Sequence, residues 1–175
     1  SFGTNGTIST GIGTQKVTVS GSGTLAGKNV GTQSIADVSG LTLADGTGKA
    51  SNYTIKDGSV TITARPLSVS ASVTDKVYDG TIAATGNTTL STNAIANDDV
   101  SASAASRTFT DKNVGDNKVI TISAIALSGS DAANYTLAAN SITTSGSITP
   151  ATLTISGSRV YDGTATANAS LFVTG

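Results

Sequence analysis

The stretch Lys-Val-Tyr-Asp-Gly-Thr at Lys76–Thr81 returns as Arg-Val-Tyr-Asp-Gly-Thr at Arg159–Thr164, an interval of 83 (159 − 76). Lys-Asn-Val-Gly at Lys28–Gly31 and Asn-Tyr-Thr at Asn52–Thr54 also recur, at intervals of 84 and 82. Several motifs that share nearly one long interval indicate a folding unit copied in tandem. We therefore expect modules of about 83 residues: 1–65 as an incomplete first repeat, 66–149 as a complete second repeat, and 150–175 as the start of a third.

The composition favours strands and turns over helices. The 175 residues include 24 Ser, 30 Thr and 20 Gly, and they lack Cys, His, Met, Trp and Glu. Thr is common in strands, Gly and Asp are common in turns, and strong helix formers other than Ala are scarce here. We therefore predict an all-β chain with a surface rich in Ser and Thr.

Apolar residues alternate with Ser or Thr directly after each proline. The alternation runs through Leu67–Val73 after Pro66 and through Ala151–Ile155 after Pro150. Alternation with a period of two is typical of a strand in an antiparallel sheet that has one buried face. A proline at the strand entrance fits this interpretation, because the missing N–H costs little there.

The apolar alternation slips by one residue at the same place in both copies of the repeat. Such a slip would turn side chains to the wrong face unless the strand absorbs an extra residue, as a β-bulge does. The apolar positions are Ala36, Val38, Leu41 and Leu43 in the first copy, and Ile120, Ile122, Ile125 and Leu127 in the second. We predict a bulge near Ser39-Gly40 and near Ser123-Ala124, and a hairpin tip near Ser145-Gly146.

About seven short strands per repeat indicate small antiparallel β-sandwich modules with an Ig-like architecture. A β-grasp-like module with a short helix is the alternative. The linkers between repeats are short and not rich in glycine, so we expect a stiff rod. The predicted core residues are Leu67, Val69, Tyr78, Phe109, Val114, Ile120, Ile122, Ile125, Leu127, Tyr135 and Leu137.

The residues that recur between the copies are the candidate site residues, and we interpret them as structural. Asp-Gly is a strong turn dipeptide, and each tyrosine of the repeated motif is expected to lay its ring over the core edge. An exposed aromatic platform for a sugar is the functional alternative. The candidates are Tyr78, Asp79, Gly80, Tyr161, Asp162, Gly163, Tyr53, Tyr135, Val30 and Val114.

Charge and residue types argue against several classes of function. The net charge is −1 without basic runs, and no apolar stretch approaches the ~20 residues of a membrane helix, so we expect neither nucleic-acid binding nor membrane insertion. Without His and Cys, the usual neutral base and the strongest nucleophile are missing, so we expect no enzyme and no catalytic residues.

The same residue types leave little for a metal or cofactor. Zinc and iron lack their usual ligands, and we predict no cofactor and no metal site. Calcium stays open as an alternative at Asn97-Asp98-Asp99 or at Asp111 with Asp116, since it binds carboxylate oxygens. A Lys–Asn isopeptide bond at Lys28 or Lys112 is a further open alternative.

The ordered set of motifs resembles the YDG repeat of large bacterial adhesins, including filamentous-haemagglutinin-like exoproteins of two-partner secretion systems. The resemblance rests on Lys76–Thr81, Lys112–Gly115, Ala133–Leu137 and Ile148–Pro150. The first copy departs from it with Ser51 in place of Ala133 and with Arg65-Pro66 in place of Thr149-Pro150.

The resemblance implies an extracellular location on a bacterial surface and a non-catalytic stalk or spacer. Such a stalk would project a binding tip for cell adhesion or for contact with biofilm matrix. The expected partners are neighbouring repeats of the same chain, with host or matrix glycans and other adhesin stalks as further candidates. A carbohydrate-binding module is the alternative function, and pairing between stalks through edge strands is a third.

Overall fold

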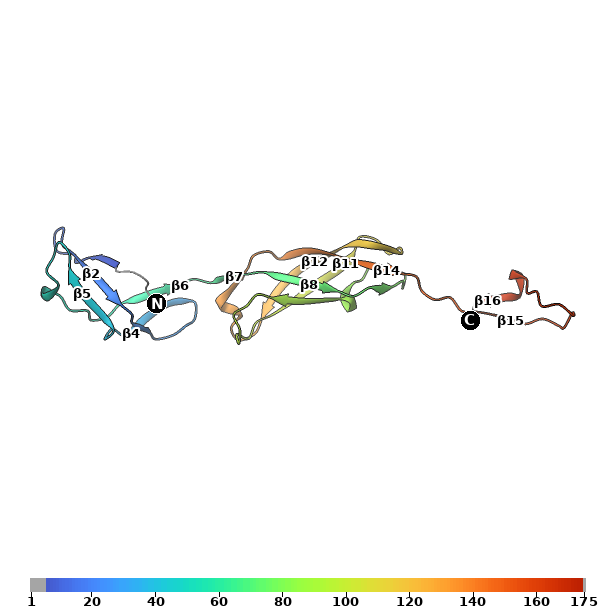
Figure 1. The fold of residues 1–175 in the computed structure, drawn as a ribbon, viewed down its shortest axis with the longest axis horizontal. Helices are drawn as coiled ribbons and strands as arrows, with labels where there is room; N and C mark the ends of the chain where they lie inside the picture. Colours follow the sequence, from blue (N-terminus) through green and yellow to red (C-terminus); the bar gives the residue numbers. More distant parts are fainter. Residues whose placement is uncertain (1–5, 175) are drawn as a thin grey trace. The chain divides into compact units, whose positions relative to one another are not determined.

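The chain is all-β in a computed structural model that describes residues 6–174 (Figure 1). Within that range the helical segments are four 3-10 turns of three residues each: Ala50–Asn52, Thr85–Asn87, Ala132–Asn134 and Ala169–Leu171. None of the described helices is long and apolar enough to cross a membrane. Short 3-10 turns do not supply the helix that a β-grasp packs on its sheet, so the β-grasp alternative does not fit these residues.

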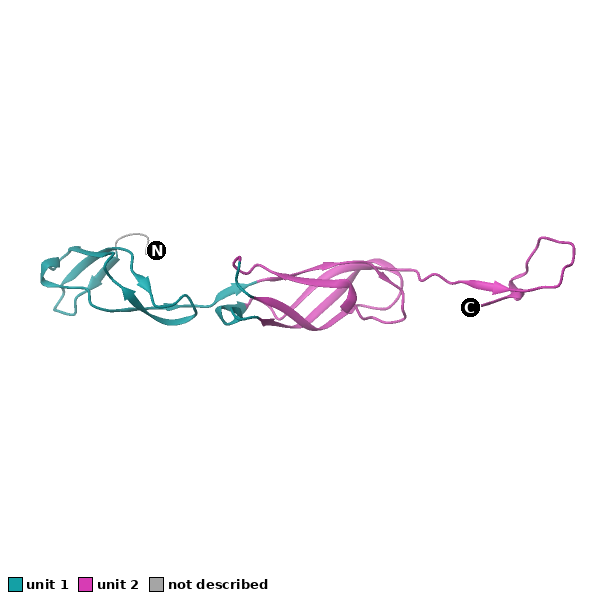
Figure 2. Ribbon diagram, turned by 90° about the horizontal axis from the view of Figure 1, so that it is seen from below, with its two compact units in different colours: residues 1–67, 97–99, 129–136 teal, residues 68–96, 100–128, 137–175 magenta. Residues whose placement is uncertain are grey.

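Two compact units make up the chain, and each is described by itself (Figure 2). Unit 1 contains the residues up to Leu67 together with 97–99 and 129–136. Unit 2 contains 68–96, 100–128 and the residues from Leu137 onward.

Unit 1 holds two three-stranded antiparallel sheets. One contains β1 (Gly6–Ser9), β2 (Lys16–Gly21) and β5 (Leu41–Asp45), and the other contains β3 (Thr24–Leu25), β4 (Gly31–Asp37) and β6 (Ser59–Ile62). The predicted phase of β4 is wrong at Ala36, which is exposed, whereas Ile35 is half-buried. The reason is the straight register of β4 with β6, from Gly31 opposite Ile62 to Ser34 opposite Ser59, which turns the odd-numbered positions inward.

A short pair of strands, β7 (Arg65–Leu67) and β13 (Tyr135–Leu137), joins two distant parts of the sequence. Leu67 is fully buried and Tyr135 is 6% exposed, so both predictions of burial are confirmed. The predicted position of Pro66 at a strand entrance is wrong, because Pro66 is the middle residue of β7; among the described residues β7 pairs with β13 alone, so its other edge tolerates the missing N–H.

Unit 2 contains a four-stranded sheet in the order β11 (Ser101–Phe109), β12 (Gly115–Ser128), β14 (Ser141–Thr149) and β9 (Lys76–Val77). All its pairs are antiparallel except β14 with β9. A second, two-stranded sheet pairs β8 (Val69–Val73) with β10 (Thr88–Thr92). Apolar side chains of the two sheets pack on each other, an arrangement consistent with a β-sandwich.

The core of unit 2 confirms most of the alternation that the sequence predicts. Fully or almost fully buried are Ala84, Phe109, Ile120, Ile122, Ile125 and Ile148, and packed against them and partly buried are Val69, Ala71, Val73, Leu90, Ala102, Ala104, Leu137 and Ile142. Leu127 is half-buried. Ile148 and Ala84 are buried residues that the predicted core did not include.

Two predicted core residues are exposed, Tyr78 at 37% and Val114 at 51%. Tyr78 follows the two-residue strand β9, where the inward position belongs to Lys76 rather than to an aromatic ring. Val114 lies in the bend before β12, outside the alternation of the strand. Both predictions of burial are wrong because these residues lie outside the strands, where no sheet face directs their side chains inward.

The apolar phase of β12 slips where predicted, but the predicted bulge near Ser123-Ala124 is wrong, because the register with β11 does not shift between Ala104 opposite Ile125 and Ser106 opposite Ser123. Ala124 has a φ of 52°, and Ile122 and Ile125 on either side of it are both buried. In the first copy the chain instead leaves the sheet between β4 and β5, with a turn closed by the Leu41 N–H donating to the Val38 carbonyl at 2.9 Å. A register shift that was not predicted lies between Gly115 and Lys118, where Asn117 has a φ of 51°.

The predicted hairpin tip at Ser145-Gly146 is wrong, because both residues lie inside β14. A Cβ at Gly146 would stand 2.6 Å from the Val73 Cγ1 and 3.2 Å from the Ile120 Cδ1. The glycine therefore lets the two sheets approach closely rather than forming a turn.

The last described segment is an antiparallel hairpin of β15 (Ile155–Gly157) and β16 (Phe172–Thr174). The strand predicted over Ala151–Ile155 is therefore wrong in its position, since β15 starts where the prediction ends.

Candidate functional site

The repeated motif at Lys76–Thr81 folds around its own lysine. Lys76 begins β9, and its side chain points inward and is 5% exposed. Its Nζ donates hydrogen bonds to the carbonyl oxygens of Thr81 at 2.9 Å and Ala83 at 2.7 Å, and to the Thr81 Oγ1 at 2.9 Å. The ammonium also lies 2.8 Å from the Asp79 Oδ1 and 5.9 Å from the centre of the Phe109 ring. A buried charge is tolerated here because oxygen acceptors surround it.

Asp79 and Gly80 close the turn that brings those acceptors to the lysine. The Asp79 Oδ1 accepts hydrogen bonds from the Thr81 N–H and the Thr81 hydroxyl, both at 2.9 Å. Gly80 has a φ of 80°, which favours glycine. The hydrogen bond from Lys76, followed by those from Thr81, lowers the pKa of Asp79 from 3.8 to about 2.

The second copy of the motif forms the same arrangement with arginine in place of lysine. The Arg159 guanidinium donates to the carbonyl oxygens of Thr164 and Thr166, to the Thr164 hydroxyl and to the Asp162 carboxylate. The Asp162 Oδ1 accepts from the Thr164 N–H and hydroxyl at 2.9 Å, which lowers the pKa of Asp162. Gly163 has a φ of 77°.

Lys76 and Arg159 were absent from the predicted site residues, although they organise both turns. The signal was in the sequence: a basic residue stands at the same place in both copies, three residues before Asp. Strand alternation alone does not identify such a residue, because it gives inward positions to apolar side chains.

Tyr53 and Tyr135 make equivalent contacts in the two copies. The Tyr53 hydroxyl donates to the Gln15 Oε1 at 2.7 Å, and the Tyr135 hydroxyl donates to the Asp98 Oδ2 at 2.6 Å. A 3-10 turn precedes each tyrosine, and its first carbonyl accepts from the tyrosine N–H. Each tyrosine hydroxyl therefore ties the end of a 3-10 turn to a residue that precedes a strand, β2 for Gln15 and β11 for Asp98.

Within unit 1, the Lys28–Gly31 motif contacts the loop that contains Asp98 and the segment from Asp131 to Asn134, which precedes Tyr135. The Val30 N–H donates to the Asn134 Oδ1 at 2.9 Å, and the Asn134 Nδ2 donates to the Asn29 Oδ1 at 3.1 Å. The Lys28 Nζ lies 3.5 Å from the Asp98 Oδ1 and 3.7 Å from the Asp131 Oδ1. The Lys28 side chain is 75% exposed, so these ion pairs add little by themselves and the amide contacts fix the geometry.

Val30 and Val114 occupy equivalent bends and are both exposed, at 38% and 51%. In the second copy the bend is held by the Asn113 N–H, which donates to the Asp111 Oδ1 at 2.8 Å, and by Lys118, 2.6 Å from the same oxygen. These interactions lower the pKa of Asp111, with Lys118 as the main cause.

The structure does not place the candidate tyrosines at one site. Tyr78 is 37% exposed and Tyr161 is 90% exposed, so neither ring covers a core as predicted. Both rings belong to the turn motif, whereas Tyr53 and Tyr135 serve the loop contacts described above.

Of the acidic residues considered for calcium, Asp98, Asp99 and Asp111 already have protein partners. Asp98 accepts from Tyr135, and the Asp99 Oδ2 accepts from the Ser130 N–H and hydroxyl, which lowers the pKa of Asp99. Over residues 6–174 no group of three or more His, Cys, Asp or Glu side chains is placed to hold a metal ion. The exposure of Lys28 also differs from the dry environment that an isopeptide bond needs.

A family model matches the part of the chain that contains the Lys76 turn, the four-stranded sheet and Tyr135. The match is to the YDG domain and covers residues 63–145. The match confirms the resemblance to the YDG repeat for this stretch, and it starts just before β7 and ends inside β14. Comparison with curated proteins and with solved structures gave no match.

Proposed function

We propose that this chain is a series of non-catalytic spacer modules, and that it serves as a stalk in a secreted bacterial surface adhesin. In this proposal the modules are tandem Ig-like β-sandwiches over 1–65, 66–149 and 150–175, of which the second is complete. Their task is mechanical reach: they hold a binding tip away from the cell for adhesion or for contact with biofilm matrix.

One observation carries the proposal: the recurring polar side chains bind the protein's own backbone and loops. Lys76 has three N–H groups for four neighbouring oxygen acceptors, and Arg159 repeats the arrangement. In this proposal the side chains recur because each module needs them to fold. They therefore serve structure and do not take part in a reaction. This is expected for modules that are copied for length.

The contacts of the Lys28–Gly31 motif support a series of linked modules. Asn134 receives the Val30 N–H and binds Asn29, although these residues lie far apart in the sequence. In the proposed division they belong to consecutive modules, so the motif would act as the link between neighbours. Neighbouring repeats of the same chain are accordingly the first partner we propose.

Small-angle X-ray scattering of one, two and three concatenated copies of 66–149 tests the spacer. Strands of nine residues rise about 30 Å at ~3.3 Å per residue. The maximum dimension should therefore grow by a nearly constant step of about that size with each copy. Growth with the square root of copy number would show flexible linkage and contradict the proposal.

A carbohydrate-binding module is the second candidate, and the exposure of Tyr78 and Tyr161 favours it. An exposed aromatic ring in the same turn of each copy resembles a platform on which a sugar ring stacks. A glycan array probed with the whole chain, and with Tyr78→Ala and Tyr161→Ala, decides between the two. Specific binding that is lost in these variants, with circular dichroism unchanged, would replace the spacer by a lectin.

A further inference from the structure

Aspartate is followed by glycine at four places in the chain: Asp45-Gly46, Asp57-Gly58, Asp79-Gly80 and Asp162-Gly163. In such a pair the glycine amide nitrogen can attack the carboxyl carbon of the aspartate, because glycine has no Cβ to obstruct the approach. The attack requires that the carboxyl group and the nitrogen are both free to meet. The four pairs therefore differ in reactivity according to what holds these two groups in the fold.

The first pair is held at both reacting groups. The Asp45 Oδ2 accepts a hydrogen bond from the Lys49 Nζ at 2.9 Å, and the Asp45 Oδ1 accepts one from the Ala50 N–H at 2.8 Å. The Gly46 N–H donates to the Gly48 carbonyl at 3.1 Å. Both the carboxylate and the nitrogen that would attack it are thus engaged elsewhere.

The two pairs in the repeated turn motif are held by their carboxylates. Lys76 and then Thr81 bind Asp79 and lower its pKa to about 2. The Thr164 N–H and hydroxyl bind Asp162 and lower its pKa as well. A lower pKa favours the ionised carboxylate, which is the less reactive form because it has no hydroxyl to lose as water.

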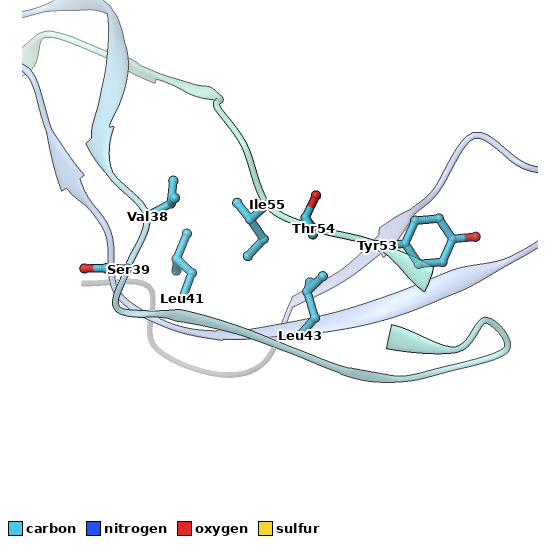
Figure 3. A pocket seen from close by; sticks show the side chains of 7 residues that line it. All are labelled: Val38, Ser39, Leu41, Leu43, Tyr53, Thr54 and Ile55. Carbon is cyan, nitrogen blue, oxygen red and sulfur yellow. The ribbon is translucent and has the colours of Figure 1, made fainter. Parts of the chain in front are cut away.

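The remaining pair lies at the end of residues 53–58, a segment without regular structure that leads from a 3-10 turn into β6. Tyr53 and Ile55 of this segment line a cavity beside Leu43 of β5 (Figure 3). Within the described part of the chain, the main chain of residues 54–57 makes no hydrogen bond. This stretch can therefore change its backbone angles without losing a hydrogen bond.

Asp57 differs from the other three aspartates because its side chain is not held. Over residues 6–174 its carboxylate has no hydrogen bond and no ion pair, and the Gly58 N–H has no acceptor. Both residues are exposed, and so are Ala139 and Asn140, their counterparts in the complete second copy at the interval of the two Asn-Tyr-Thr motifs. The exposure is therefore a property of this loop in both copies.

We propose that Asp57-Gly58 is a site at which this chain converts spontaneously to isoaspartate. The Gly58 nitrogen bonds to the Asp57 Cγ, and the carboxyl hydroxyl leaves with the amide proton as water, so that a succinimide ring closes. Water then adds to one ring carbonyl. Breaking the bond from the nitrogen to the main-chain carbonyl carbon of Asp57 leaves the chain linked through Cγ, whereas breaking the new bond restores aspartate. Water is the only co-reactant, and the proposal does not depend on the spacer function.

The modification would change the start of β6. The Gly58 carbonyl accepts from the Ile35 N–H at 2.9 Å, and the next residue, Ser59, lies opposite Ser34 of β4. An isoaspartyl link inserts one more carbon atom into the main chain directly before these contacts. The pairing of β6 with β4 should therefore weaken from this end.

Digestion with a protease that cleaves before aspartate but not before isoaspartate measures each site separately. The folded chain is aged at physiological temperature and neutral pH, then unfolded and digested. The uncleaved fragment 45–74 reports on Asp57. It should accumulate at least about tenfold faster than the uncleaved fragments that report on Asp45, Asp79 and Asp162, because the attack needs both groups to meet.

The same chain aged in guanidinium chloride shows whether the fold causes the difference. All four pairs should then react at similar rates, since the contacts that hold Asp45, Asp79 and Asp162 are lost. Equal rates at the four sites of the folded chain overturn the proposal. So does a ranking of the sites that is the same in the folded and the unfolded chain.

Gly58→Ala tests the attacking nitrogen. Its Cβ would lie 3.2 Å from the Ile35 Cδ1, the flexible end of a side chain, so the loop can accept it. The variant should slow the reaction at Asp57 by about tenfold or more, because the Cβ obstructs the approach. Gly86→Ala is the matched control, at an exposed glycine whose Cβ would meet nothing within 4 Å, and it should age like the parent. An unchanged rate in Gly58→Ala, with the circular dichroism of the parent, would contradict the proposal.

Discussion

At the scale of single residues, the buried Lys76 organises the turn formed by the repeated motif. The Lys76 ammonium collects two carbonyl oxygens, a hydroxyl and a carboxylate within 2.9 Å. We predict that Lys76→Met lowers the free energy of unfolding by about 1–3 kcal/mol, because the carbonyls of Thr81 and Ala83 would lose their charged donor. Chemical denaturation monitored by circular dichroism measures this.

The matched control is Lys76→Arg, since Arg159 fills the same place in the other copy of the motif. It should keep most of the stability of the parent chain. If Lys76→Met were as stable as Lys76→Arg, the turn would not depend on the buried cation.

Asp79 gives this turn a dependence on acid. Its folded-state pKa is lowered to about 2 from 3.8, first by Lys76 and then by Thr81. A carboxyl whose pKa is lowered on folding stabilises the protein above its unfolded pKa and loses that effect as the pH falls toward the folded value. The contribution is therefore complete above about pH 4 and disappears between about pH 4 and pH 2.

Asp79→Asn should consequently reduce the loss of stability between pH 5 and pH 2.5, measured as the change in the midpoint of urea unfolding. Thr81→Val, which removes one donor to the carboxylate, should give an intermediate change. An acid loss in Asp79→Asn equal to that of the parent would show that this carboxylate does not contribute.

At the scale of elements, the slip in β12 depends on one residue in an unfavourable conformation. Ala124 has a φ of 52°, which costs an alanine roughly 1–2 kcal/mol relative to its usual conformations. Ala124→Gly should raise the free energy of unfolding by up to about 1 kcal/mol, and Ala124→Val should lower it by a similar amount or more. A decrease with glycine would contradict the conformation described.

The elements also show where sequence patterns are sufficient and where they are not. Alternation predicted the burial of Ile120, Ile122 and Ile125 together with the slip between them, because a sheet with one buried face fixes the phase. It misplaced Ala36, because the phase of β4 depends on its register with β6, and the sequence of β4 does not contain that register. Gly146 was predicted in a turn because glycine is common in turns. Its actual role is to leave room for Val73 of β8, and this tertiary contact cannot be seen in the local sequence.

The candidate site was predictable as a set of positions but not as a set of roles. Recurrence identified Asp79, Gly80 and Tyr135, and the structure gives each a hydrogen bond or a turn conformation. It did not show that Lys76 is buried or that Tyr78 is exposed. Both depend on which residue of the two-residue strand β9 takes the inward position, and that choice follows from the acceptors around Lys76.

At the scale of the whole molecule, we infer that the recurring residues make each module fold with its own contacts. The core of β8 to β12 and β14 lies entirely between Val69 and Ile148. Among the described residues, polar contacts at Asp98, Asp131 and Asn134 and the short β7–β13 pair link this core region to the first copy. A module of this kind should fold alone, and its core should not change when the rest of the chain is removed.

The most direct measurement is the ¹⁵N–¹H NMR spectrum of residues 63–149 alone, compared with that of the whole chain. We expect a dispersed spectrum in which the amides of Phe109, Ile120, Ile122 and Ile148 keep their positions, with shifts confined to the surroundings of Asp98, Asp131 and Asn134. A collapsed spectrum typical of an unfolded chain, or shifts throughout the core, would contradict it.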